Sequence, residues 1–148
     1  MMTEKPKKFK ISKDFKPLSA EEGDEFFANG MFEFNVTRLL AFVRDNLSKF
    51  PVEEVNVRQW AIWGSIHLNE ATIENVNLAI PIILAEISPG RFNVIDGNHR
   101  LEKAHRHGME KISAHKVRAD QHIAFLKSEK AYRAYIKYWN SKVDDWGG

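Results

Sequence analysis

The sequence predicts one α/β (α+β) domain in which a small mixed β-sheet is flanked by helices. Two apolar segments, 79–88 and 91–95, are joined by a Ser-Pro-Gly turn and predict a pair of strands. Segments with helical spacing precede and follow this pair, and a further strand-like segment lies at 111–117. A length of 148 residues suits one hydrophobic core, and no internal repeat or second domain boundary interrupts the chain.

In the first half, the best-defined element is a helix that begins after a capping Asn35. Apolar side chains recur at helical spacing from Val36 to Phe50, and Pro51 ends the pattern. Upstream, Ser19 followed by an acidic turn predicts a short helix, whose pattern is lost around Asn29 and Gly30.

The next segment alternates and predicts a strand from Val55 to Ile62, followed by a loop over 63–67. Asn69 or Thr72 then opens a helix that runs to about Ala79.

In the second half, the strand 91–95 leads through Asp96 and Gly97 into a helix that begins near Asn98 and ends at Gly108. After the strand at 111–117, Ser128 can cap a last helix. Its apolar face is formed by Tyr132, Tyr135, Ile136 and Trp139, which we expect to be core residues.

Composition excludes several classes of function. With 43% hydrophobic and 28% charged residues, the chain has globular composition, and no apolar run approaches the roughly 20 residues that span a bilayer. We therefore expect no membrane partner and a cytoplasmic location, because the basic start lacks the apolar region of a secretory signal. No cysteine is present, so thiol chemistry is excluded. We expect residues 1–12 to form a basic flexible tail and 13–148 the folded domain.

The residues Asp96 to Arg100, "DGNHR", form the strongest candidate site. The first N–H groups of a helix lack intrahelical partners, and the helix dipole favours an anion there. Gly97 permits a tight turn and close approach of a phosphate, Asn98 can cap the helix, and His99 and Arg100 can donate to an anion. The alternative is an ordinary turn in which Arg100 pairs with a nearby carboxylate.

The segment "IPIILAEISPGRFNVIDGNHRLEKAHRHGMEKISAHKV", residues 80–117, resembles the central part of the ParB/sulfiredoxin superfamily. The resemblance implies a ParB/sulfiredoxin-like domain that binds the phosphates of ATP or CTP through Gly97, Asn98, His99 and Arg100. Sulfiredoxins have their catalytic cysteine where this chain has Asn98, and ParB proteins carry Gly-Glu-Arg-Arg at the turn. The Asp-Gly-His-His-Arg turn of a free-serine kinase branch is more similar, which favours phosphoryl chemistry.

By this resemblance the protein is expected to be a magnesium-dependent nucleotide hydrolase or phosphotransferase. Asp96 would lie near the metal and the transferred phosphate, and His99 would act beside it in catalysis. The sequence does not choose the catalytic base, for which the candidates are Glu21, Glu22, Asp24, Glu25, Glu70 and Glu74. Trp63 would stack on the base and His67 would border it; a core tryptophan beside a surface histidine is the alternative.

Two other functions remain open from the sequence. One is a DNA-binding or nuclease module that uses the lysines of the tail and a basic edge over residues 106–118, namely Arg106, Lys111, Lys116 and Arg118. The other is a non-enzymatic regulatory or immunity protein in which a degenerate pocket only stabilises the fold.

Overall fold

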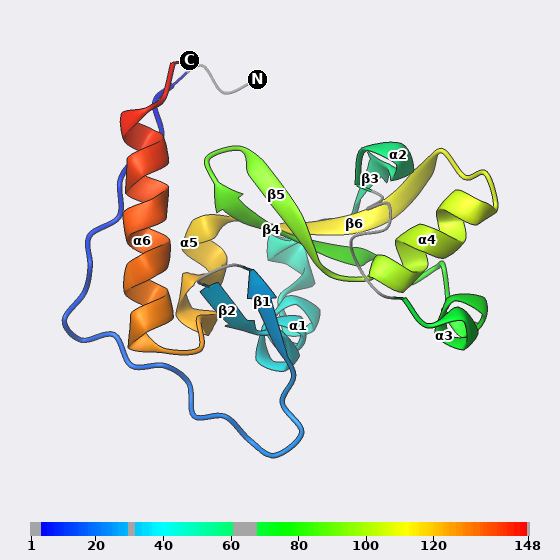
Figure 1. The fold of residues 1–148 in the computed structure, drawn as a ribbon, viewed down its shortest axis with the longest axis horizontal. Helices are drawn as coiled ribbons and strands as arrows, with labels where there is room; N and C mark the ends of the chain where they lie inside the picture. Colours follow the sequence, from blue (N-terminus) through cyan, green and yellow to red (C-terminus); the bar gives the residue numbers. More distant parts are fainter. Residues whose placement is uncertain (1–3, 30–31, 61–67, 148) are drawn as a thin grey trace.

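The protein folds around a four-stranded mixed sheet, seen in a computed structural model that describes residues 4–29, 32–60 and 68–147 (Figure 1). The strand order is β3-β6-β4-β5. The strands are β3 (Glu53–Asn56), β4 (Ile82–Ser88), β5 (Arg91–Asp96) and β6 (Lys111–Val117). β4 runs antiparallel to β5 and parallel to β6, and β3 pairs antiparallel with β6. The predicted fold class is confirmed, as are the two strands joined by the Ser-Pro-Gly turn.

The central strand β4 supplies both faces of the core. All seven of its residues are buried, as expected for a continuous apolar run in the middle of a sheet. Side chains alternate across a strand, so Ile82 and Leu84 pack on the face that carries α4 (Asn98–Arg106), where they contact Leu101. Ile83 packs on the opposite face with α1 (Val36–Asp45).

A long helix, α6 (Glu129–Asp144), lies at the other side of the sheet from α4 (Figure 1). Ser128 caps it by accepting from the N–H of Ala131, as predicted. Its buried face joins Phe32 and Phe34 and the β4 residue Ile87 in one cluster. The buried face consists of the predicted core residues Tyr132, Tyr135, Ile136 and Trp139, with Ala131 and Val143. These aromatic contacts attach the helix to the sheet.

Short helices complete the layers. They are the 3-10 helices η1 (Leu47–Lys49) and η2 (Ile123–Phe125), and the α-helices α2 (Val57–Trp60), α3 (Glu70–Asn75) and α5 (Ala119–His122). In the part of the chain that the structure describes, no helix has the length and apolar character that crossing a membrane requires.

The N-terminal segment lies along α6 (Figure 1). The side chain of Asn140 accepts from the N–H of Phe9 at 2.8 Å and donates to its carbonyl at 2.9 Å. The indole N–H of Trp139 donates to the carbonyl of Lys7, and the ring of Phe15 stacks on Tyr132 with centroids 3.9 Å apart. Residues within the predicted tail over 1–12 thus make specific contacts with this helix.

The short helix predicted after Ser19 is wrong. The chain instead forms a hairpin of β1 (Phe26–Asn29) and β2 (Phe32–Asn35). Aromatic residues on both sides of an Asn-Gly pair are a hairpin signal, and they outweigh the helical capping pattern. Phe34 is fully buried and its backbone bridges to Leu126, so the hairpin is fixed by tertiary contacts.

Three other boundaries differ from the prediction. The segment predicted as a strand over 55–62 forms the end of β3 and then α2. The chain turns there because the N–H of Val57 donates to the carbonyl of Glu110 and the side chain of Val57 is buried in the core. Residues 61–62 lie outside the described part. The helix capped by Asn69 ends at Asn75. The helix capped by Asn35 ends at Asp45 and continues as a 3-10 turn.

Candidate phosphate-binding site

The turn between β5 and α4 has the backbone that the sequence predicts. Gly97 has a φ of 109°, in the left-handed region that favours glycine, and the helix begins at the next residue. The capping residue is Gly97 itself, so the prediction that Asn98 caps the helix is wrong. Within residues 4–29, 32–60 and 68–147, no side-chain cap bonds the first N–H groups of α4, since Gly97 has no side chain to supply one, and no acidic residue lies in the first turn of the helix. The helix therefore presents uncompensated donors at this end.

Gly97 is also required by packing. A Cβ at this position would lie 2.5 Å from the Cγ2 atom of Ile82 and 2.8 Å from its Cβ atom, both in a buried side chain. These distances are shorter than van der Waals contact. The glycine is thus explained by the fold, and its presence alone does not indicate a phosphate.

Arg100 has partners within the protein. Its Nη2 atom donates to Oδ2 of Asp96 at 2.5 Å, and its Nη1 atom donates to the carbonyl of Ile80 at 3.3 Å. The side chain of Arg100 is only 12% exposed and that of Asp96 33% exposed, so water screens this pair less than a surface ion pair. The sequence offered a phosphate or a nearby carboxylate as the partner of Arg100, and the structure shows the carboxylate of Asp96 in contact with it.

Two further polar side chains of α4, those of His99 and Lys103, hold α3 in place. Nε2 of His99 accepts from the N–H of Asn69 at 3.3 Å, which requires that this nitrogen carry no proton. At the other end of α3, Nζ of Lys103 donates to the carbonyls of Glu74 and Val76 at 2.8 and 2.9 Å. His99 and Lys103 therefore compensate the two ends of one short helix.

Arg106 adds a bidentate contact to α3. Its Nη atoms donate to both carboxylate oxygens of Glu70 at 2.6 and 3.0 Å, and its Nε donates to Glu102 at 2.9 Å. The hydrogen bonds from Arg106 hold the pKa of the Glu70 carboxyl below its ordinary value, and the two carboxylates raise the pKa of Arg106. A general base needs a free carboxylate, so Glu70 is poorly suited to that role.

The magnesium prediction depends on Asp96. Magnesium in nucleotide sites is held by one or two carboxylates together with substrate phosphates. Asp96 can supply one carboxylate at the turn, and that carboxylate is paired with Arg100. Within residues 4–29, 32–60 and 68–147, no three His, Asp or Glu side chains are grouped so that they could hold a metal ion.

The predicted base-stacking residues Trp63 and His67 lie outside the described residues. On the predicted basic edge, Arg106 is paired as above, Lys116 pairs with Glu53 at 3.1 Å and Arg118 lies 3.7 Å from Asp120. Most of the positive charge of this edge is therefore neutralised locally.

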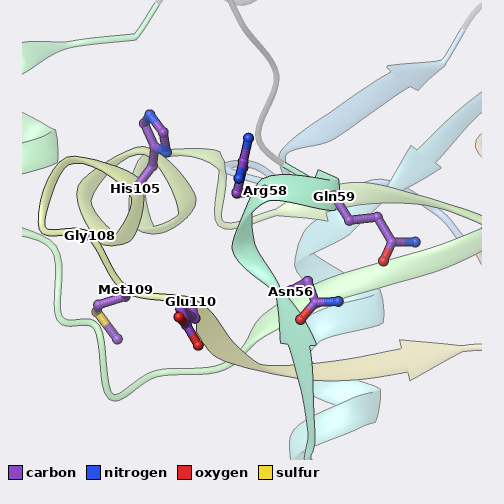
Figure 2. A pocket seen from close by; sticks show the side chains of 7 residues that line it. All are labelled: Asn56, Arg58, Gln59, His105, Gly108, Met109 and Glu110. Carbon is purple, nitrogen blue, oxygen red and sulfur yellow. The ribbon is translucent and has the colours of Figure 1, made fainter.

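A pocket of about 530 Å³ lies at the opposite end of α4 from the turn. α2 and the α4–β6 connection form it, with Asn56, Arg58, Gln59, His105, Gly108, Met109 and Glu110 as its lining. Figure 2 shows that the side chains of His105 and Arg58 extend to one side and those of Met109 and Glu110 to the other. The polar groups do not converge on one point, and the nine residues of α4, roughly 13 Å, separate this pocket from the turn.

A buried polar network behind β4 was not predicted from the sequence. The carboxylate of Glu86 accepts from the N–H groups of Gly90 at 2.9 Å and Ala119 at 3.0 Å. The backbone carbonyl of Glu86 accepts from Nε2 of His122 at 2.6 Å and from the hydroxyl of Tyr135 at 2.8 Å. The sequence did contain a signal for this network, namely one glutamate within the apolar run of β4. A carboxylate buried there needs hydrogen-bond donors from neighbouring elements.

Burial controls the protonation of this network. It lowers the pKa of His122 to about 4, and it raises the pKa of the Tyr135 hydroxyl above its ordinary value, with a further contribution from Glu86. Nδ1 of His122 has no hydrogen-bond partner among the described residues. His122 and Tyr135 are therefore neutral near pH 7, and the contacts of the network assign it to packing α5 and α6 onto β4.

The chain matches no protein family model, no curated protein and no solved structure. The resemblance of residues 80–117 to the ParB/sulfiredoxin superfamily therefore stays a prediction.

Proposed function

We propose that the protein binds the phosphate groups of a nucleotide, ATP or CTP, at the β5–α4 turn. One observation carries the proposal: α4 begins with Asn98, His99 and Arg100, and in the part of the chain that the structure describes their N–H groups have no side-chain cap and the first turn contains no acidic residue. A helix end of this kind attracts anions through its donors and its dipole. The resemblance of the "DGNHR" turn to nucleotide-binding turns supports the same assignment.

The chemical step that we propose involves Asp96, His99 and Arg100. A phosphate at the turn competes with Asp96 for the donors of Arg100. Once released, the carboxylate of Asp96 can face a nucleotide-bound magnesium ion or an attacking hydroxyl, while Arg100 and His99 stabilise charge on the phosphoryl oxygens. Transfer to water would make the protein a hydrolase, and transfer to another hydroxyl a phosphotransferase.

The second candidate is a regulatory protein that binds a nucleotide without turning it over. The specific observation in its favour is that the side chains proposed for chemistry already have internal partners, Asp96 with Arg100 and His99 with Asn69. A nucleic-acid function at the 106–118 edge receives less support, because ion pairs neutralise Arg106, Lys116 and Arg118.

The test uses the variant Asn98→Asp. Its control is Asn56→Asp, which makes the same change of charge in β3, in the pocket at the other end of α4. A negative charge in the first turn favours the helix dipole but repels phosphate, so the melting temperature is retained while nucleotide binding is lost. In wild type, ATP or CTP with magnesium at 100 times its dissociation constant adds about 2.7 kcal/mol of apparent stability. No thermal shift with either nucleotide, or unchanged binding by Asn98→Asp, would refute the proposal.

A phosphate-release assay separates the two candidates. Asp96→Asn keeps an oxygen acceptor for Arg100 but removes the charge that would face the metal, so a hydrolase variant binds nucleotide and loses turnover. Nucleotide binding by wild type without phosphate release or transfer would favour the regulatory protein.

A further inference from the structure

A cationic groove follows the outward face of α6 and continues to the turn between β4 and β5. Its first part, about 770 Å³, is lined by Glu129, Lys130, Arg133, Ala134, Lys137 and Tyr138. Its second part, about 540 Å³, is lined by Pro89, Arg91, Tyr138, Lys142, Asp145, Trp146 and Gly147. Tyr138 belongs to both parts, so they form one surface, here called the α6 groove.

The charge of the α6 groove is strongly positive. Five cationic side chains line it against two carboxylates. Only Arg133 has a carboxylate partner within the described residues, Glu129 at 3.0 Å. Lys142 lies over the ring of Tyr138 at 5.3 Å, while Lys130 and Lys137 are exposed on the helix. An accumulation of unpaired cations raises the local concentration of a polyanion.

The fold does not require these cations. The opposite face of α6 carries Tyr135 and Trp139 into the core, and the N-terminal segment is held at a flank by Asn140. Among the described residues, the lysines of the outward face make no hydrogen bond to the backbone of another element, in contrast to Lys103 on α4. Their charge is therefore available to a partner.

The aromatic residues identify the kind of polyanion. Tyr138, which lines both parts of the groove, and Trp146, which lines the second part, are each partly exposed beside the cations. A cationic track interleaved with aromatic platforms suits single-stranded nucleic acid, whose phosphates pair with cations while its bases stack. An acidic peptide would use the cations but would leave the aromatic platforms without a matching group.

We propose that the α6 groove binds single-stranded nucleic acid. Lys130 and Lys142 are twelve positions apart, roughly 18 Å along the helix axis, which suits a strand of several nucleotides. The α6 groove shares no residue with the β5–α4 turn, so binding of nucleic acid in the groove does not depend on nucleotide binding at the turn.

The first experiment measures binding of a labelled oligothymidylate of about 12 nucleotides by fluorescence anisotropy, as a function of salt. Each phosphate neutralised contributes about 0.7 to the slope of log affinity against log salt. The variant Lys130→Gln/Lys137→Gln is expected to reduce that slope by about 1.4 and to weaken binding about tenfold or more at low salt. Arg58→Gln/Lys111→Gln is the matched control, with equal charge loss near the pocket of Figure 2.

The second experiment tests stacking. Trp146→Ala is expected to weaken oligothymidylate binding about fivefold or more, while Trp146→Phe retains most of the affinity because it keeps an aromatic face. Absence of binding at low salt, an equal loss in the control pair, or equal affinity of Trp146→Ala and Trp146→Phe would each overturn the proposal. Polyglutamate that competes as well as an unlabelled oligothymidylate would reassign the groove to an acidic peptide.

Discussion

The helices α4 and α6 use their charged side chains in opposite ways. On α4, the cations have partners inside the protein: Arg100 bonds Asp96, Lys103 bonds two carbonyls at the end of α3, and Arg106 bonds Glu70. On α6, by contrast, Lys130 and Lys137 project from the outward face with no carboxylate partner among the described residues. Charge on α4 positions neighbouring elements, whereas the charge of these two lysines on α6 is available to a ligand.

The difference follows from how each helix is attached to the sheet. α6 buries large aromatic side chains, including Tyr135 and Trp139, and its polar contact to the sheet is made from that buried face by the Tyr135 hydroxyl, so its outward cations are not needed to hold it. α4 buries Leu101 and Ala104, and it also has to support α3, a six-residue helix with one buried side chain, Ile73. A helix so short is not stable alone, so its two ends depend on side chains from α4.

The largest expected effect concerns the inner face of α6. Tyr135→Ala removes a fully buried ring and leaves a cavity, so we expect a loss of about 4 kcal/mol in the free energy of unfolding, measured by urea denaturation. Tyr135→Phe removes only the hydroxyl that donates to Glu86, and it should cost about 1 kcal/mol. Equal losses for the two variants would mean that the hydroxyl, and not the ring, attaches α6.

The second prediction concerns the turn before α4. Gly97→Ala combines a left-handed φ with a Cβ that meets Ile82, so we expect a loss of about 3 kcal/mol. Gly108→Ala is the matched control, because its φ is +70° but nothing lies within 4 Å of the added Cβ; it should cost about 1 kcal/mol. Thermal or urea unfolding of both variants measures the difference. Similar losses would show that Ile82 moves aside.

The elements around Gly97 could be predicted from sequence because their signals are local. An apolar strand, a turn with glycine and a helical pattern follow one another between 82 and 106, and Gly90, Gly97 and Gly108 all adopt the positive φ that glycine permits. For the hairpin of β1 and β2 the local signals conflict, a helical capping pattern at Ser19 against an Asn-Gly pair between aromatic residues, and the contact that fixes the hairpin involves a residue far along the chain, Leu126. Patterns within a short window do not contain that contact.

The site was only partly predictable for a similar reason. The sequence places Asp96 and Arg100 four positions apart and offers both an internal ion pair and a phosphate as partners of Arg100. The distance of 2.5 Å between Arg100 Nη2 and Asp96 Oδ2 shows the internal ion pair, and the phosphate stays a proposal. The hydrogen bonds from Lys103 and His99 to the ends of α3 could not be predicted, because the sequence does not give the position of α3 relative to α4.

The third prediction is a pH dependence that originates at α5. His122 has a pKa of about 4 in the folded protein against an ordinary value of 6.5, so the unfolded chain binds its proton more readily. The contribution of His122 to stability is therefore complete above pH 6.5 and is lost as the pH falls toward 4, by up to about 3 kcal/mol.

Urea denaturation at pH 7 and pH 4.5 measures this loss, and His122→Gln isolates it. Glutamine keeps an N–H donor for the carbonyl of Glu86 but does not titrate. The variant is expected to be less stable than wild type at pH 7 and to show a flatter dependence on pH. A parallel dependence in both proteins would place the titration elsewhere.

The smallest effect tests the contrast between the two helices directly. Arg100→Ala leaves Asp96 without its partner and frees the carbonyl of Ile80, so we expect a loss of about 1 kcal/mol, moderated because Asp96 is one-third exposed. Lys137→Ala removes an exposed cation that has no carboxylate partner among the described residues, and it should change stability by less than about 0.5 kcal/mol. Urea denaturation at low and high salt measures both. Because the Arg100 pair is partly buried, its contribution should persist at high salt, whereas an equal loss in both variants would mean that the charge of α6 also stabilises the fold.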